Sequence, residues 1–218
     1  ASRARATGLD VIALADHNSA RNTPALAVCC REAGLACLFG LEVCTAEEVH
    51  TLALFDTLDQ AAAMTDWIYD SLPKRVNQPE VFGDQPVVLA DETIVELELR
   101  LLAGASRHAL RDIGARTHEL GGLFLASHVD RPVNSVFSQL GVLSGDEGFD
   151  AMELSRHADP AAWRDRAAPH ALVRSSDAHY LDDIGSGWSE ADLPAFTTAA
   201  LRDAFARRSV RLGPPVVR

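Results

Sequence analysis

Apolar runs alternate with amphipathic stretches along this chain, and several of the runs end in side chains that can bind a metal. The runs are VIALADHN, CLFGLEV, VHTLALF, LFLASHVD and ALVRSSDAH. Continuous apolar runs of this length are typical of strands that are buried on both faces. Between them, helical periodicity predicts connecting helices, so the pattern favours an α/β barrel. The metal-binding side chains at or near the predicted strand ends are Asp16, His17, Glu42, His50, His128, Asp177 and His179.

The spacing of apolar positions, together with proline and glycine signals, predicts the remaining elements. We expect strands at 9–15, 36–43, 49–55, 123–127, 149–154, 171–175 and 210–212. We expect helices at 23–33, 58–72, 106–120, 160–168 and 197–208, after a helix tail at 3–7. Ser106 is the predicted N-cap of its helix.

Residues 74–100 interrupt this alternation. The segment VVLADETIVE has two β-branched runs around Ala-Asp-Glu, which predicts a β-hairpin inserted at about 76–100. A hairpin at this place would lie over the site as a lid.

Length and composition restrict the classes of protein. A chain of 218 residues that is 47% hydrophobic suits one domain, 1–218, and it has no apolar run of the roughly 18 residues that a membrane span needs. No signal peptide is recognisable, so we expect a cytoplasmic protein without a membrane partner. Cys29, Cys30, Cys37 and Cys44 include no CxxC pair and are expected to be reduced, structural thiols.

The formal net charge of -11 disfavours a broad basic surface and hence the binding of duplex nucleic acid. A small phosphorylated substrate or a short oligonucleotide end is compatible with it, because a local metal cluster can overcome an acidic average. The charge does not indicate the oligomeric state.

Each predicted ligand has an alternative interpretation. His17 can bind a divalent metal or cap the next helix, and Glu42 can bridge two cations or be a surface acid. His50 opens its strand instead of ending it, so its place at the rim depends on the direction of that strand. Asp177 and His179 are two residues apart and point to one side of an extended segment, unless they form an Asx turn.

Two arginines near the strand ends are candidate substrate ligands. Arg131 follows His128 and can clamp a phosphate, or it can form a salt bridge with Asp130 or Glu153. Arg156 lies with Glu153 in MELSRH, which is predicted to contact substrate or to support the metal ligands.

Taken together, GLDVIALADHNSARN, GLEVCTAEEVHTLALF, FGDQ, ASHVDRP and SSDAHYLDDIG resemble the PHP (polymerase and histidinol phosphatase) family, in particular its small bacterial phosphoesterases. The resemblance implies a distorted TIM-like (β/α)7 barrel with two or three divalent ions such as Zn, Mn or Fe. It implies that Glu42 bridges two metals, that His50 and His128 complete the second, that Asp177 binds the first, and that His17 and His179 serve the third. The family's first strand, with its H-x-H motif, has no counterpart in these residues, so we expect that strand to be missing.

The resemblance therefore predicts a metal-dependent phosphoesterase that hydrolyses a phosphomonoester or a nucleotide or oligonucleotide phosphate with metal-activated water. Its catalytic residues would be Glu42, His128 and Asp177. Two alternatives stay open. The chain can be a catalytically impaired metal-binding remnant with a structural or regulatory role, or an amidohydrolase-like metalloenzyme, because similar barrels use similar ligands for both reactions.

Overall fold

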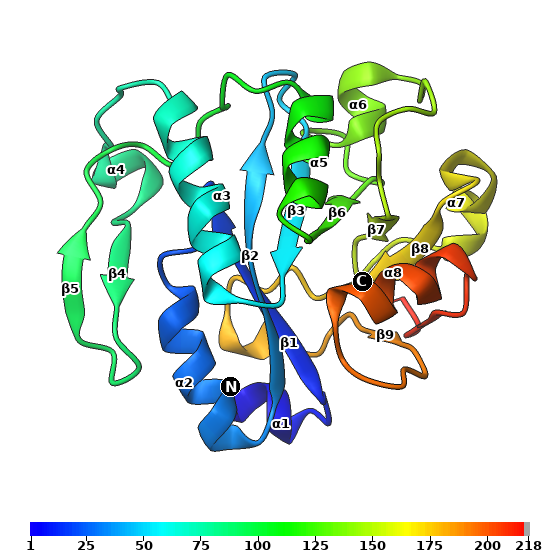
Figure 1. The fold of residues 1–218 in the computed structure, drawn as a ribbon, viewed down its shortest axis with the longest axis horizontal. Coiled ribbons are helices and arrows are strands. Elements are labelled where there is room, and N and C mark those ends of the chain that lie inside the picture. The colour runs from blue at the N-terminus through cyan, green and yellow to red at the C-terminus, as the bar shows by residue number, and fades with distance from the viewer. Residues whose placement is uncertain (216–218) are drawn as a thin grey trace.

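A curled six-stranded sheet forms the centre of the computed structural model, which describes residues 1–215 (Figure 1). Its strand order is β1-β2-β3-β6-β7-β8. These strands are β1 (Val11–His17), β2 (Ala36–Cys44), β3 (His50–Phe55), β6 (Leu123–Ala126), β7 (Ala151–Leu154) and β8 (Ala171–Arg174). The mixed α/β architecture is consistent with the expected TIM-like barrel.

Strand direction departs from a uniform parallel barrel at one strand. β3 is antiparallel to both of its neighbours, β2 and β6, whereas β1 pairs parallel with β2, and β6, β7 and β8 pair parallel with one another. β1, β2, β6, β7 and β8 therefore share one direction, and their carboxyl ends meet at one rim together with the amino end of β3. In the described part of the chain, β1 and β8 each pair on one side only.

Eight α-helices of the described residues accompany the strands. They are α1 (Ser2–Ala6), α2 (Thr23–Ala33), α3 (Leu58–Ser71), α4 (Pro79–Phe82), α5 (Leu110–Glu119), α6 (Val136–Leu140), α7 (Pro160–Ala167) and α8 (Thr198–Ala206). A 3₁₀ turn covers Leu181–Asp183. A capping box between Thr57 and Gln60 starts α3, and Gly34, with φ of 67°, ends α2. Among helices of residues 1–215, none is long and apolar enough to cross a membrane.

The two faces of the sheet bury different apolar clusters, because successive side chains of a strand point to opposite faces. Leu41 and Phe55 belong to the face that packs against α3 and α5. Leu38, Leu54 and Leu125 belong to the other face, which is closed in part by α8 through Phe205. Glu42 and His50 lie on this second face as well, at the rim where the strands end.

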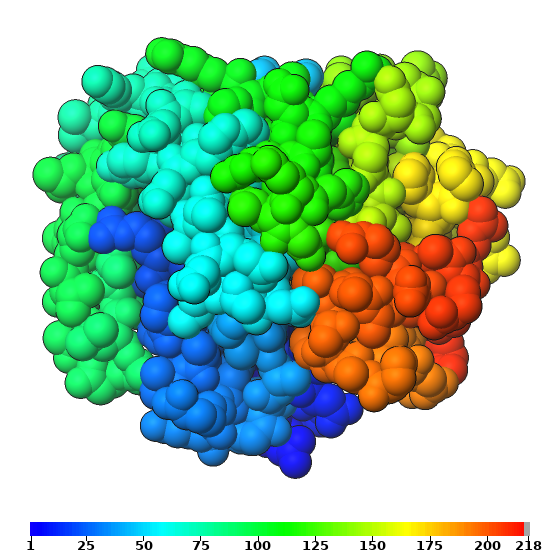
Figure 2. All heavy atoms as spheres, in the orientation of Figure 1, coloured from blue at the N-terminus to red at the C-terminus, as the bar shows by residue number. Residues whose placement is uncertain are grey.

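A two-stranded antiparallel sheet of β4 (Pro86–Val88) and β5 (Ile94–Leu97) lies beside the central sheet. Figure 2 shows this green segment packed against the blue N-terminal part of the chain. Arg21 makes an ion pair with Glu96, and the Asn22 side chain donates to Pro86 O at 3.1 Å and accepts from Val88 N at 3.0 Å. The segment is thus fastened to the loop that follows β1.

The structure differs from the sequence predictions in several places. Ser106 does not cap α5, because the helix begins at Leu110 with Ala109 at the N-cap position, and the carboxylate of Glu47 accepts from Leu110 N. α6 was not predicted, because it is only five residues long. The last predicted strand, β10 (Arg211–Leu212), pairs with β9 (Ser189–Glu190) outside the central sheet.

All four cysteines are free thiols.

Candidate metal centre

Residues at the ends of β1 and β2 lie side by side because these strands are parallel neighbours. His17 and Glu42 are direct partners in the β1–β2 register, and the ladder continues through Asn18 N, which donates to Glu42 O at 2.8 Å. Nδ1 of His17 lies 3.3 Å from Oε2 of Glu42. Backbone pairing alone therefore brings an imidazole and a carboxylate together.

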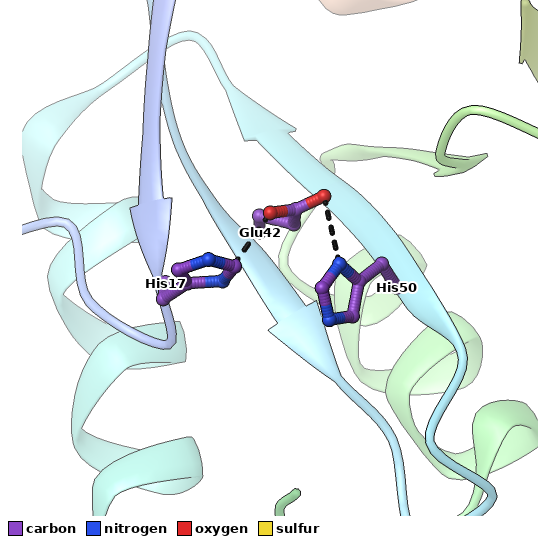
Figure 3. A group of neighbouring side chains, drawn as sticks. All are labelled: His17, Glu42 and His50. Atoms are coloured by element: carbon purple, nitrogen blue, oxygen red, sulfur yellow. Dashed lines mark ion pairs between the residues drawn. The ribbon is translucent and has the colours of Figure 1, made fainter. Parts of the chain in front are cut away.

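His50 reaches the same rim because β3 runs in the opposite direction. Its register partner on β2 is Cys44, so its side chain lies diagonal to Glu42 on the same face of the sheet. Nδ1 of His50 lies 3.3 Å from Oε1 of Glu42, and only 11% of the His50 side chain is exposed (Figure 3). Antiparallel pairing thus resolves how a residue that opens a strand can join residues that end strands.

His128 comes from the turn after β6. Its Nε2 lies 3.3 Å from Oε1 of Glu42, and its backbone has φ of 29°, in the left-handed region. The backbone amide of His128 donates to Oε2 of Glu153 at 3.1 Å, and the amide of Val129 donates to Glu153 O at 2.8 Å. Contacts with β7 therefore hold this strained turn in place.

Burial and mutual charge set the protonation of these groups. Burial favours a higher pKa for Glu42, but hydrogen bonds from His128 and His50 and the charges of the neighbouring rings outweigh it and lower that pKa. Burial favours a lower pKa for His128, but its contact with Glu42 raises that pKa above the ordinary value. For His17, burial dominates and lowers the pKa. Glu42 is thus an anion that faces three imidazoles.

The donor set fits a divalent cation. One ligand atom each from His17, Glu42 and His50 lies within 4.8 Å of the others. Imidazole nitrogens with a carboxylate oxygen suit zinc, manganese and iron. Nδ1 of His17 is buried and makes no hydrogen bond within residues 1–215, although it faces Glu42. A buried ring nitrogen without a hydrogen bond is costly unless a further ligand pairs with it.

The remaining predicted ligands lie at the end of β8 and are engaged differently. Asp177, with φ of 46°, makes an ion pair with Arg131. His179 is two-thirds exposed, and its Nδ1 contacts the backbone oxygen of Asp177 at 3.1 Å. Neither belongs to the His17–Glu42–His50 group, but the charge of His179 contributes to the lowered pKa of His17. Their role as ligands stays a prediction.

The two candidate substrate arginines are both paired with carboxylates. Arg131 contacts Asp177 and not Asp130 or Glu153, the two partners that its alternative interpretation named. Asp130 instead accepts hydrogen bonds from the backbone amide and hydroxyl of Ser155. Arg156 pairs with Asp183 at 2.6 Å and donates to Ser186.

Supporting residues of the centre were less visible in the sequence. Glu153 is 4% exposed and contacts both the amide of His128 and the hydroxyl of Ser175, so it joins β6, β7 and β8 at the rim. Asn134 contacts the ring of His50 at 3.1 Å. The position of Glu153 at the end of an apolar run signalled a role; Ser175 lies in the segment SSDAHYLDDIG but was not singled out, and no pattern pointed to Asn134.

A cleft of about 1370 Å³ opens beside the centre. Its lining includes His17, Glu42, Glu153, Asp177 and His179 at the rim. The lining also includes apolar residues of the sheet face that α8 closes in part, among them Leu38, Leu54, Leu125 and Val173. Phe82, Gln85 and Pro86 from the inserted segment form part of its wall. Within residues 1–215, the edge strands β1 and β8 each pair on one side only, and both border this cleft.

No protein-family model and no curated protein matches this chain. Among solved structures, the chain is similar to the lesion-specific Endonuclease Q from Pyrococcus furiosus, with a TM-score of 0.64 and 16% identity over 97% of this chain and 52% of that chain. It is also similar to an Endonuclease Q bound to a 27-mer duplex with an abasic lesion, with a TM-score of 0.61 and 17% identity over 93% of this chain and 49% of that chain.

A third similar structure is a candidate metal-dependent phosphoesterase from Bifidobacterium adolescentis. Its TM-score is 0.53 and its identity 18%, over 96% of this chain and 89% of that chain. The chain thus spans about half the length of the Endonuclease Q chains and most of the length of this one.

These comparisons correct the exclusion of duplex nucleic acid, which was wrong. The net charge argued against a duplex partner, yet a protein of this fold is solved with a DNA duplex. Net charge averages over the whole surface, whereas phosphate contacts depend on local charge. At 16–18% identity the comparisons establish a shared fold. The chain shares its fold with about half of each Endonuclease Q chain and with most of the Bifidobacterium protein.

Proposed function

We propose that this protein is a metal-dependent phosphoesterase of the PHP type, with its metal centre at Glu42. The observation that carries the proposal is the convergence of His17, Glu42 and His50 from three adjacent strands onto one point beside a cleft. Register and strand direction place all three, so the arrangement is built into the sheet.

Each residue of the centre has a role that follows from its position. His17 and His50 would hold divalent ions together with Glu42, whose carboxylate presents one oxygen to each ring. His128 contacts the same oxygen as His50 and extends the ligand set. Bound divalent ions would activate a water molecule and neutralise charge on the phosphate oxygens. We propose two or three ions, of zinc, manganese or iron, as the PHP resemblance implies.

The end of β8 completes the proposal. Asp177 and His179 line the same cleft as Glu42, and we propose that they bind a further ion. Arg131, which now neutralises Asp177, would then contact the substrate phosphate, because a cation at Asp177 replaces its charge. We propose that Arg156 contacts the substrate as well, although its ion pair with Asp183 restricts the movement of its side chain.

Two classes of substrate are open to such a centre. One is a phosphomonoester, such as a nucleotide 3′-phosphate. The other is a phosphodiester of nucleic acid, and the fold shared with Endonuclease Q, solved on a DNA duplex, favours this second class. A cleft of about 1370 Å³, partly walled by the inserted segment, has room for either.

Hydrolysis assays of matched substrates test the proposal. Metal-stripped protein is supplied with Mn²⁺ and offered a nitrophenyl phosphomonoester, a nitrophenyl phosphodiester and a DNA duplex with an abasic site. We expect hydrolysis of at least one, and a loss of roughly 100-fold or more in Glu42→Gln and in His128→Ala. Full metal-dependent activity in both variants would show that the site is wrongly assigned.

The competing proposal is a metal-binding remnant with a structural or regulatory role. It is favoured by the engagement of Asp177 with Arg131, away from the His17–Glu42–His50 group. At most one tightly bound metal, without hydrolysis of any phosphoester, would support the remnant. Hydrolysis of an amide or lactam, with none of the phosphoesters, would support the amidohydrolase-like alternative instead.

A further inference from the structure

His50 is held at both its backbone and its ring by one residue, Asn134. The backbone amide of His50 donates to Asn134 O at 2.8 Å. At the far end of the ring, Nδ2 of Asn134 lies 3.1 Å from Nε2 of His50. The opposite ring nitrogen, Nδ1, faces Oε1 of Glu42 at 3.3 Å. One imidazole therefore spans the distance between an amide and the carboxylate of the centre.

These contacts define one tautomer of His50. A neutral imidazole has one N–H and one lone pair. If the amide nitrogen of Asn134 donates to Nε2, the ring proton lies on Nδ1 and points at Glu42. In this tautomer Nδ1 cannot ligate a cation, because its lone pair is occupied by the proton.

Metal binding through Nδ1 requires the other tautomer. The proton then lies on Nε2, which needs an acceptor, since a buried donor without a partner is destabilising. A half-turn of the Asn134 amide places Oδ1 where Nδ2 lies and supplies that acceptor. A side-chain amide can serve both tautomers in this way, because it has a donor and an acceptor on one planar group.

The local backbone holds Asn134 in position for this contact. Its φ is 54°, a left-handed conformation that asparagine adopts more readily than most residues. The next residue, Ser135, starts α6 with a capping box and donates from its hydroxyl to Arg131 O at 2.7 Å. The loop is thus fixed on the C-terminal side of Asn134. Little conformational entropy is therefore lost when the Asn134 amide contacts the His50 ring.

We propose that Asn134 is a positioning residue that stabilises either tautomer of His50 and thereby sets the affinity of the centre for a divalent cation. The proposal rests on the metal centre at Glu42 proposed above. Hydrogen-bond partners behind metal-binding histidines orient the ring and raise its basicity. Asn134 would do so for His50 without contacting the metal.

Two substitutions test the side-chain contact of Asn134 with the His50 ring separately from its backbone contact with His50 N. Asn134→Gly removes the amide but tolerates the positive φ and keeps the backbone oxygen that His50 N contacts. Asn134→Asp keeps an acceptor and tolerates the same backbone, but it has no donor. Glu92→Gly, at an exposed position with φ of 69° in the β4–β5 turn, is the matched control for glycine at a left-handed residue.

Zn²⁺ alone is the probe, with its affinity measured by competition against a chromophoric chelator in the full metal-stripped chain. We expect Asn134→Gly to weaken Zn²⁺ binding about 10- to 100-fold, whereas Asn134→Asp binds at least as tightly as the unaltered protein and Glu92→Gly is unchanged. Binding by Asn134→Gly within about twofold of the unaltered protein, at equal folded fraction, would overturn the proposal. Absence of Zn²⁺ binding by the unaltered protein would overturn the metal centre itself.

A spectroscopic readout distinguishes tautomer control from a merely structural role. Nitrogen NMR of ¹⁵N-histidine protein reports which ring nitrogen carries the proton, and the His50 signals are assigned by their loss in His50→Gln. We expect the proton on Nδ1 without metal and on Nε2 with Zn²⁺, and on Nε2 in both states of Asn134→Asp. A proton on the same nitrogen in every state would contradict the assigned role.

Discussion

His17 and Glu42 face each other across adjacent parallel strands, with 3.3 Å between Nδ1 and Oε2. They are register partners at the last position of their shared ladder, so no loop has to fold to bring them together. Loops are usually the more mobile parts of a site. A centre whose first two groups are set by strand pairing is therefore held in place before any ligand arrives.

Substitution of Glu42 is expected to abolish tight metal binding. Glu42→Gln keeps the shape of the side chain but removes the anion that faces His17, His50 and His128. We expect Mn²⁺ affinity to fall by about 100-fold or more, measured by isothermal titration of metal-stripped protein. Glu119→Gln, an exposed acid on α5, is the control. Equal affinity in Glu42→Gln and Glu119→Gln would exclude Glu42 as a ligand.

Glu153 is expected to stabilise the rim mainly through hydrogen bonds. Glu153→Leu leaves the buried amide of His128 without its partner, which costs roughly 1–3 kcal/mol, and it also removes the acceptor of the exposed Ser175 hydroxyl. Glu153→Gln retains an acceptor for His128 N and a donor for Ser175, so it should lose much less. Urea unfolding at pH 7 measures the difference. Equal free energies of unfolding for the two variants would contradict this role.

Asp150 gives a pH-dependent contribution to stability away from the metal centre. Burial favours a higher pKa for its carboxyl, but hydrogen bonds from His118 and Phe124 N, the charge of His118 and a hydrogen bond from Arg202 outweigh it and lower the pKa below 3.8. A lowered folded-state pKa means that the stabilisation is complete above the unfolded pKa and is lost as pH falls through the folded value.

The change Asp150→Asn tests this sign. We expect it to destabilise the protein by roughly 1–3 kcal/mol at pH 7, because the carboxylate makes charge-assisted hydrogen bonds. The difference from the unaltered protein should shrink as pH falls below 3.8. Asp182→Asn, a fully exposed carboxyl, is the control in urea unfolding across pH. A difference that grows as pH falls would refute the assignment.

Arg131 is expected to affect phosphate binding more than metal binding. In Arg131→Ala the carboxylate of Asp177 loses its ion-pair partner and can bind a cation, while the proposed contact of Arg131 with phosphate is lost. We expect Mn²⁺ affinity to be equal or higher and inhibition by inorganic phosphate to weaken about tenfold, or about 1.4 kcal/mol. Weaker metal binding with unchanged phosphate inhibition would show that Arg131 supports the metal centre instead.

The strand ends could be predicted from the sequence because burial on both faces produces continuous apolar runs. His17, Glu42 and His128 lie at the ends of such runs, so a shared rim was a reasonable inference. His50 was less certain, because one strand's direction cannot be inferred from its apolar pattern. The structure places His50 at the rim through antiparallel pairing with β2, which sequence spacing left open.

Hydrogen bonds between distant segments could not be predicted. Asn134 and Ser175 act through side-chain hydrogen bonds between segments far apart in the chain, and although Ser175 lies in SSDAHYLDDIG, that segment did not indicate its contact with Glu153. The start of α5 was misplaced for the same reason, since the acceptor for its first amide, Leu110 N, is the distant Glu47 and not the nearby Ser106. The single domain over 1–218, the seven-stranded count and the missing first strand stay predictions.

The anomalous scattering of a crystal grown with Mn²⁺ tests the central claim most directly. We predict an anomalous peak within bonding distance of Glu42, His17 and His50, at roughly 2.0–2.3 Å from their ligand atoms. A Glu42→Gln crystal grown in parallel should have no such peak. A crystal of the unaltered protein without a peak at Glu42, or with one that persists in Glu42→Gln, would contradict the account.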